Sequence, residues 1–143
     1  MNKFKFYLLS FTWGLPMTLI GCIVALILLV IGKKPKKYGY GFHFEIGNDW
    51  GGLSLGIVLI TDKTPSEHIK MHEVGHGLQN CYWGFLMPFV ICIPSAIRYW
   101  YRELKYYRKG KTPPTKYDDI WFEGDASKRG TEFIESLGEK NGN

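Results

Sequence analysis

The residues best placed to do chemistry are two histidines and a glutamate in the segment His72-Glu73-Val74-Gly75-His76. Residues four apart lie on one face of an α-helix, so the imidazoles of His72 and His76 would point the same way. Two imidazoles at this spacing can bind one zinc ion, and Glu73 beside them could act on a water molecule held by that ion. The alternative is that the pattern arose by chance in a helix with two solvated or buried histidines.

The flanking sequence predicts this helix independently of the motif. Thr64-Pro65-Ser66-Glu67 has the spacing of a capping box, with proline at the first helical position. These residues predict the start of a helix that covers residues 67–80. Because the helix is expected without the histidines, we favour zinc binding over a chance match.

A catalytic zinc site usually has three protein ligands and leaves one position for water. The candidates for the third ligand are Glu123, His68, His43 and Asp125. His68 lies one turn before His72, but three ligands in line on one helix do not suit tetrahedral coordination. Glu123 belongs to a separate predicted helix, which can cross the first one, and a buried carboxylate there would need a partner. These considerations favour Glu123.

The segment around Glu123 also carries a family resemblance. Glu123-Gly124-Asp125-Ala126 resembles the ExxA pattern that follows HExxH in gluzincins, especially in HtpX-like membrane metallopeptidases. The preceding residues, 117–122, are similar to the matching segment of small bacterial membrane proteins that carry an HExxH motif. The resemblance covers two short motifs, about a tenth of the chain.

The resemblance implies a role for each matching residue. His72, His76 and Glu123 would be the zinc ligands, and Glu73 the general base. HtpX-like enzymes usually place an aspartate directly after the alanine, where it supports the site; this chain has Ser127 there. Asp125 or Ser127 would have to take over that support.

The stretch before the motif has a strand-like period. Phe42, Phe44 and Ile46 alternate with polar residues, and an apolar run follows over residues 53–60. The two runs are separated by residues 47–52, which are rich in glycine, and together they predict a β-hairpin packed on the zinc helix. The hairpin either offers its edge to an extended substrate or only completes the core.

Two apolar segments indicate a membrane protein. Residues 1–32 are uncharged from Phe6 onward and have no signal-peptide cleavage site, which predicts an uncleaved transmembrane anchor. Residues 81–97 are shorter and contain Pro88 and Pro94, so this segment either spans with kinks or is re-entrant. The predicted organisation is an anchor over residues 1–32 and a minimal zincin-like domain over residues 33–143, an α+β membrane protein overall.

The net charge of +5 is concentrated beside the apolar segments. Basic residues in such positions are typical of contacts with anionic lipid headgroups and of cytoplasmic loops. They predict an integral membrane protein with its site facing the cytoplasm, and they make nucleic-acid binding the poorer interpretation. The basic residues in question are Lys33, Lys34, Lys36, Lys37, Arg98, Arg102, Lys105, Arg108, Lys109 and Lys111.

The last predicted helix runs from Asp118 to Leu137. One face carries residues that could meet another helix, and two of them, Ala126 and Gly130, are small enough for close approach. The full face consists of Glu123, Ala126, Ser127, Gly130, Phe133, Ile134 and Leu137.

The function that these features predict is a zinc-dependent, membrane-associated endopeptidase, with peptides or membrane proteins as substrates. Glu73 would take a proton from water and pass it to the leaving amine. Tyr117 or His43 would stabilise the oxyanion. The alternative is a non-catalytic membrane protein in which zinc fastens two helices. The substrate's identity and the oligomeric state stay open.

Overall fold

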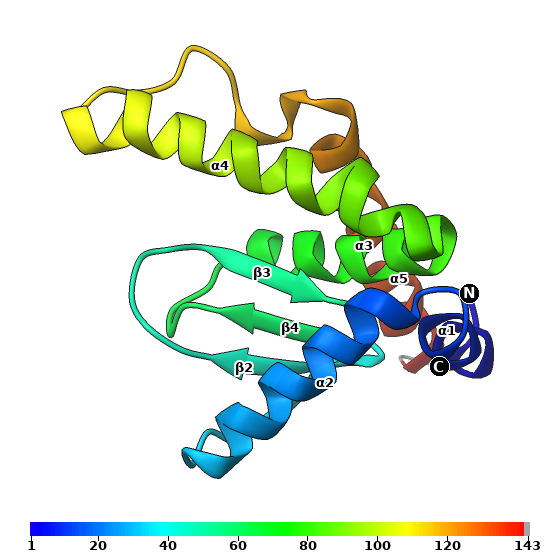
Figure 1. The fold of residues 1–143 in the computed structure, drawn as a ribbon. Helices are drawn as coiled ribbons and strands as arrows, with labels where there is room; N and C mark the ends of the chain where they lie inside the picture. The colour runs from blue at the N-terminus through cyan, green and yellow to red at the C-terminus, as the bar shows by residue number, and fades with distance from the viewer. Residues whose placement is uncertain (142–143) are drawn as a thin grey trace.

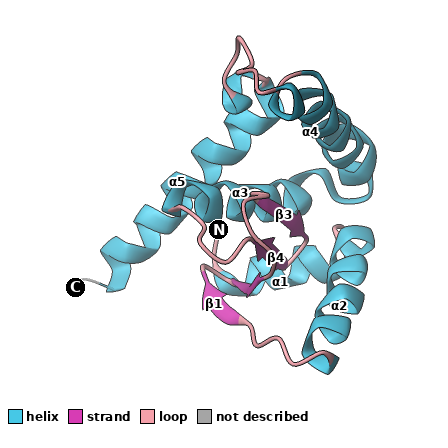
Figure 2. Cartoon of the chain, turned by 90° about the vertical axis from the view of Figure 1, so that its left-hand side faces the viewer, coloured by secondary structure: helices cyan, strands magenta, loops and turns pink. Residues whose placement is uncertain are grey.

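Helix α3 (Glu67–Trp83), which carries the histidine motif, is the central element of the computed structural model (Figure 1). The structure describes residues 1–141, in which five α-helices pack around one four-stranded sheet. One layer of the core lies between α3 and the sheet, and α5 (Trp121–Asn141) covers the opposite side of α3 (Figure 2). The α+β class that the sequence predicts is confirmed.

The sheet has the strand order β1-β2-β4-β3. Its strands are β1 (Lys36–Tyr38), β2 (Gly41–Glu45), β3 (Gly52–Leu55) and β4 (Val58–Thr61). β1 pairs with β2 and β3 pairs with β4 in antiparallel fashion, whereas β2 pairs with β4 in parallel. The predicted hairpin between residues 42–46 and 53–60 is therefore wrong, because its second run is itself folded into the β3–β4 hairpin.

Gly56 explains why the apolar run over residues 53–60 folds back on itself. Its φ of +66° suits the first central position of a two-residue hairpin turn, which Gly56 makes with Ile57. A Cβ at Gly56 would also lie 2.6 Å from the Thr18 side chain. This turn is not evident from the sequence, because the residues on both sides of Gly56 are apolar. A turn is normally indicated by polar residues, and strands that are buried on both faces lack them.

Helices α3 and α5 cross at unusually short range. A Cβ at Gly75 would lie 1.8 Å from the carbonyl oxygen of Ala126, and one at Gly130 would lie 1.7 Å from that of Met71. The close approach predicted from the small residues of the last helix is thus confirmed. The helix starts at Trp121 rather than Asp118, after a 3-10 turn over Tyr117–Asp119.

The start of α3 differs slightly from the capping box in the sequence. Ser66, not Thr64, is the N-cap, and its hydroxyl accepts a hydrogen bond from the backbone N–H of Ile69 at 3.2 Å. Pro65 therefore precedes the cap instead of occupying the first helical turn. The helix also extends to Trp83, where Gly84 ends it with a positive φ of 56°.

The expected single helix over residues 1–32 is instead two helices, α1 (Lys3–Phe11) and α2 (Leu15–Val30), bent by 93°. Pro16 lies at the start of α2, where proline fits a first helical turn but would break a continuous helix. Within the described residues, no single helix is both long and apolar enough to cross a membrane.

A second bend separates α3 from α4 (Ile93–Lys105). Between them lie a 3-10 turn over Gly84–Leu86 and a π-helical segment over Pro88–Cys92, so the chain turns by 116° at Pro88. By length and composition, this bent pair and the α1–α2 pair could each enter a membrane as a broken span or a re-entrant loop. Helices α2 and α4 both lie on the side of the molecule away from α5 (Figure 2).

Candidate metal centre

The structure brings together His72, His76 and Glu123, the three residues predicted as metal ligands. Glu123 Oε2 lies 3.0 Å from Nε2 of His72 and 3.1 Å from Nε2 of His76, and the two Nε2 atoms are 3.1 Å apart. All three side chains are buried, and Glu123 has no exposed surface. Together they form a group that can hold a metal ion.

The outer nitrogen of His76 is held by Gln79, one turn further along α3. Gln79 donates through Nε2 to the carbonyl oxygen of Phe122 at 2.9 Å and to Asp125 Oδ2 at 2.8 Å. Both partners are acceptors, so Gln79 Oε1 is the atom that faces His76 Nδ1, at 2.8 Å. His76 Nδ1 must therefore carry a proton and donate, so in the neutral imidazole the lone pair is on Nε2, which faces Glu123.

The outer nitrogen of His72 is held in the same way from α5. Ser127 donates its hydroxyl proton to Asp118 Oδ2 at 2.7 Å, so its oxygen can only accept from His72 Nδ1, also at 2.7 Å. In the neutral imidazole of His72 the lone pair is therefore also on Nε2, which faces Glu123. Ser127, which follows Ala126 in the chain, therefore orients His72 and is itself held by Asp118.

Three groups that can share a proton or a metal ion thus converge in the interior of the protein. Burial acts to raise the pKa of Glu123, but hydrogen bonds from the two imidazoles, aided by Ser95, outweigh it and hold that pKa far below its usual range. The carboxylate is therefore ionised. An anion and two imidazole lone pairs about 3 Å apart need a cation, either a metal ion or shared protons.

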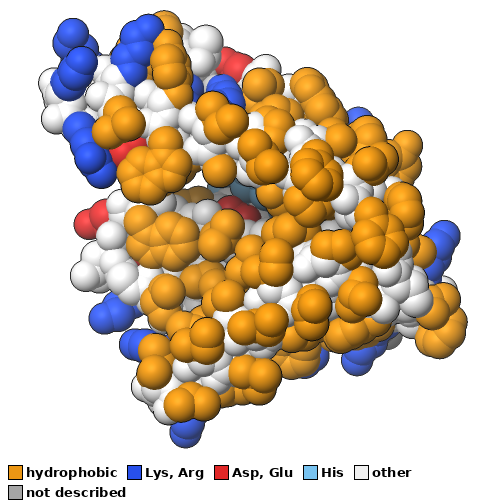
Figure 3. All heavy atoms as spheres, in the orientation of Figure 1, with side chains coloured by type: hydrophobic (Ala, Val, Ile, Leu, Met, Phe, Trp, Pro, Cys, Tyr) orange, Lys and Arg blue, Asp and Glu red, His pale blue; other side chains and the backbone are white. Residues whose placement is uncertain are grey.

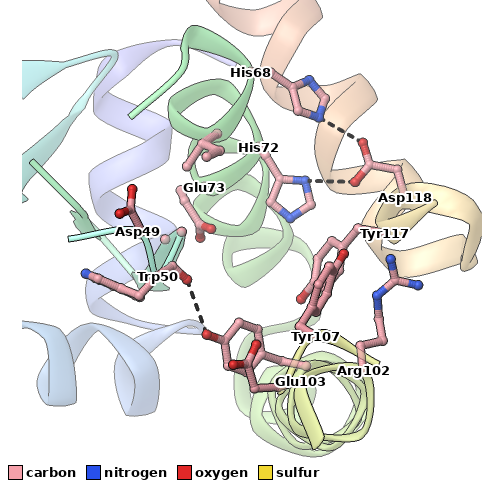
Figure 4. Close-up of a pocket in the computed structure, with 14 residues that line it drawn as sticks. Asp49, Trp50, His68, His72, Glu73, Arg102, Glu103, Tyr107, Tyr117 and Asp118 are labelled. Carbon is pink, nitrogen blue, oxygen red and sulfur yellow. Dashed lines mark hydrogen bonds and ion pairs between the residues drawn. The ribbon is translucent and has the colours of Figure 1, made fainter. Parts of the chain in front are cut away.

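Glu73 lies beside this cluster, at the inner end of a cleft (Figure 4). Burial raises its pKa, although the neighbouring imidazoles act in the opposite direction. Among the described residues its carboxylate has no hydrogen-bond partner. The side chain fits because residue 52 is glycine: a Cβ there would lie 2.7 Å from Glu73 Oε1.

The cleft separates α3 and the β3 edge of the sheet from α4. Its volume is about 560 Å³, and its walls come from α3, from the loop before β3, from α4 and from the turn before α5. Tyr99 bridges the walls by donating to the carbonyl oxygen of Trp50 at 3.3 Å. Tyr117 lines the cleft next to the cluster, with its ring centroid 6.0 Å from that of His72.

The remaining candidates from the sequence lie outside the cluster. His68 pairs with Asp118 at 2.9 Å and is largely exposed. His43 is on β2, where it makes a 2.7 Å hydrogen bond with Thr61, and it belongs neither to the cluster nor to the residues that line the cleft. Asp125 acts only indirectly, through Gln79, and pairs with Arg129.

Three supporting residues escaped the sequence analysis. Gln79 could have been found, because it follows His76 by three positions and so shares its helix face. Asp118 was noted only as the start of a helix. Ser95, which donates to Glu123 Oε1, lies in an apolar segment and gives no signal in the sequence.

No match was found among protein-family models, curated proteins or solved structures. The interpretation of this site therefore depends on its geometry and chemistry.

Proposed function

We propose that the protein is a zinc-dependent peptide hydrolase of the gluzincin type. The observation that carries this proposal is the convergence of His72, His76 and Glu123 beside an unpaired Glu73 at the inner end of a cleft. A site that only fastens helices has no need of an additional carboxylate facing open space. Hydrolysis of a bound chain does need one, as the group that accepts a proton from water.

The donor set suits zinc. Two imidazole nitrogens and one carboxylate oxygen are typical ligands of catalytic zinc, and their spacings of 3.0–3.1 Å are close to the value of about 3.3 Å for tetrahedral ligands roughly 2.0 Å from the metal. Bound zinc supplies Lewis acidity, which lowers the pKa of a water ligand to about 7 and polarises a carbonyl group.

Glu73 is the proton carrier in this proposal. It is adjacent in sequence to His72 and its carboxylate is free of competing hydrogen bonds among the described residues. Burial raises its pKa above that of an exposed glutamate, which makes the carboxylate a stronger base toward water. Such a base would take a proton from water and later return it to the leaving amine.

The open edge of β3 would bind the substrate backbone. The backbone N–H of Asp62 donates to the carbonyl oxygen of Gly51. Hydrogen-bonded and non-hydrogen-bonded pairs alternate along an antiparallel ladder, so the N–H and C=O of the next residue, Gly52, point away from β4. These groups lie beside Glu73. An extended peptide can pair with them whatever its side chains, which gives affinity without a sequence requirement.

Tyr117 is the proposed oxyanion donor. Burial and the charge of Glu123 raise the pKa of its phenol, so the hydroxyl keeps its proton. The ring is held in place by the guanidinium groups of Arg98 and Arg102, 5.1 and 5.6 Å from its centroid. A positioned hydroxyl beside the metal can donate to the oxygen on which charge develops.

A structural metal site is the second candidate. It is favoured by the fact that the three ligands come from α3 and α5 alone, the two helices that cross most closely. Metal binding would then stabilise the crossing without any turnover.

The first prediction concerns metal content. Detergent-purified protein should contain about one zinc ion per chain by elemental mass spectrometry, since all three ligands are preorganised. His76→Ala and Glu123→Ala should lose the zinc, whereas His68→Ala, which removes an exposed imidazole outside the cluster, should retain it. A wild-type protein that stays metal-free after incubation with zinc would refute the proposal.

The second prediction separates the two candidates. Glu73→Gln removes the base but keeps the shape, so zinc content should be unchanged while hydrolysis of a fluorogenic peptide library falls by about 10²–10⁴-fold. Turnover equal to that of the wild type would exclude Glu73 as the base. Zinc-loaded wild type that cleaves nothing would favour the structural site.

A further inference from the structure

Two stripes of apolar side chains lie exposed on the side of the molecule opposite α5. On α2 the stripe follows helical spacing, with Leu19, Ile23, Leu26 and Val30 between 52% and 86% exposed. The second stripe runs from the turn after α3 along α4 with the same spacing. Its members are Leu86, Phe89, Ile93, Ile97, Trp100 and Leu104, all at least half exposed.

The two stripes belong to one face. Figure 3 shows apolar side chains covering both α2 and α4 on the same side, with the cleft opening between them. β3, which runs between these helices in Figure 1, adds the exposed Leu53. Single exposed apolar residues are normal on soluble proteins, but a continuous face of this extent marks a contact with lipid or protein.

The charges around this apolar face indicate which contact it makes. Residues 6–32 and 84–97 contain no charged side chain, whereas basic residues follow each stripe at its end. Lys34 is exposed after α2, and Arg108, Lys109 and Lys111 are exposed after α4. Anionic lipid headgroups would neutralise these cations, whereas a second copy of this chain would bring more cations of its own.

The length of α2 and the aromatic residues near α4 indicate how deeply the apolar face enters the membrane. α2 has 16 residues, about 24 Å, which is shorter than the hydrocarbon core of about 30 Å. Exposed Trp100, Tyr101 and Tyr107 on the α4 side are of the kind that lies at headgroup depth. We propose that the apolar face of α2 and α4 seats the protein in one leaflet of an anionic membrane, with the basic ends at the headgroups.

Two basic residues predicted to join this contact do not. Arg102 is buried, with Nη1 donating to the carbonyl oxygen of Thr115 at 3.0 Å, and Arg98 donates to that of Lys116 at 3.1 Å. Both hold the loop before α5 in place. The headgroup contact therefore depends on the residues beyond the ends of α2 and α4.

The test is flotation of the full chain after reconstitution from detergent. Wild type should float with vesicles of phosphatidylcholine and phosphatidylglycerol in equal amounts, and less with phosphatidylcholine alone. Lys33→Gln combined with Lys34→Gln should weaken partition by about fivefold for each lysine on the anionic vesicles. Flotation requires neither bound metal nor turnover, so a wild type that does not float would leave the proposed hydrolase function unaffected.

Matched variants test the apolar face itself. Val30→Glu combined with Phe89→Glu should abolish flotation, whereas Lys128→Glu on α5, which also lowers the net charge by two, should float like wild type. Equal far-ultraviolet circular dichroism and melting would show that all variants fold. The proposal is overturned if the Val30→Glu, Phe89→Glu double variant still floats. It is also overturned if the wild type does not bind vesicles and instead forms a dimer that is absent in the double variant.

Discussion

The two sides of α3 differ in how much room they leave. Toward α5 the helices touch backbone to backbone at Gly75 and Gly130, and the polar side chains between them form a closed hydrogen-bond network. Toward α4 the walls stand apart and enclose a cleft of about 560 Å³. The three proposed metal ligands lie at the tight side, with His72 also reaching the wall of the cleft, and Glu73 and Tyr117 face the open side.

This difference would separate two tasks of the proposed hydrolytic site. The ligands of a metal ion have to be held within a few tenths of an ångström of their binding positions. A helix crossing lined with glycine achieves this, because the backbones are in contact and the helices cannot shift relative to each other. The substrate and the water that it reacts with need space. Damage to the tight side should therefore remove the metal, whereas damage to the open side should remove only turnover.

The largest effect is expected where the helices touch. Gly130→Ala places a Cβ 1.7 Å from the carbonyl oxygen of Met71, so the helices must move apart and the ligands separate. We expect a loss of about 3 kcal/mol in the free energy of unfolding, together with loss of zinc.

Gly138→Ala is the matched control for Gly130→Ala. It lies on the same helix with no atom within 4 Å of the added Cβ, so it should be neutral or stabilise by up to about 1 kcal/mol. Urea denaturation and zinc analysis of both variants measure the difference. Equal stabilities would show that the crossing is not as tight as the structure has it.

A smaller effect on metal binding is expected for a residue that contacts a proposed ligand without being one itself. Ser127→Ala removes the acceptor for His72 Nδ1, so the imidazole loses its orientation while remaining present. Loss of such a partner typically weakens metal binding by about 10–100-fold.

Competition with a chromophoric chelator measures this change in affinity for Ser127→Ala. Ser136→Ala is the control, since the one hydrogen bond of its hydroxyl among the described residues goes to the carbonyl oxygen of Phe133 within the same helix. An unchanged zinc affinity in Ser127→Ala would mean that Asp118, 3.8 Å from His72 Nδ1, orients the ring alone.

The tight side was largely predictable from the sequence and the open side was not. Spacing alone puts His72 and His76 on one helix face, and small residues at Ala126 and Gly130 predict the crossing that brings in Glu123. These are local, periodic signals, and helix geometry translates them directly into positions.

The cleft depends on long-range pairing that local patterns do not encode. The turn at Gly56 lies inside an apolar run, and its consequence is that β3, rather than β4, becomes the edge strand beside Glu73. The bends before Leu15 and at Pro88 likewise decide where α2 and α4 lie. Hydropathy identifies the segments of α2 and α4 as apolar, but it does not predict how the chain folds back between the helices.

The smallest effect on the metal is expected on the open side. Gly52→Ala adds a Cβ 2.7 Å from Glu73 Oε1, and this flexible side chain must shift to accommodate it. The ligands do not touch residue 52, so zinc affinity should equal that of wild type, while displacement of the base by about 1 Å lowers kcat by up to about 10²-fold. Leu53→Ala, which truncates an exposed neighbour on the same strand, should leave both unchanged. If Gly52→Ala instead released zinc with full retention of fold, the two sides of α3 would be coupled, and the division between holding the metal and positioning the base would be wrong.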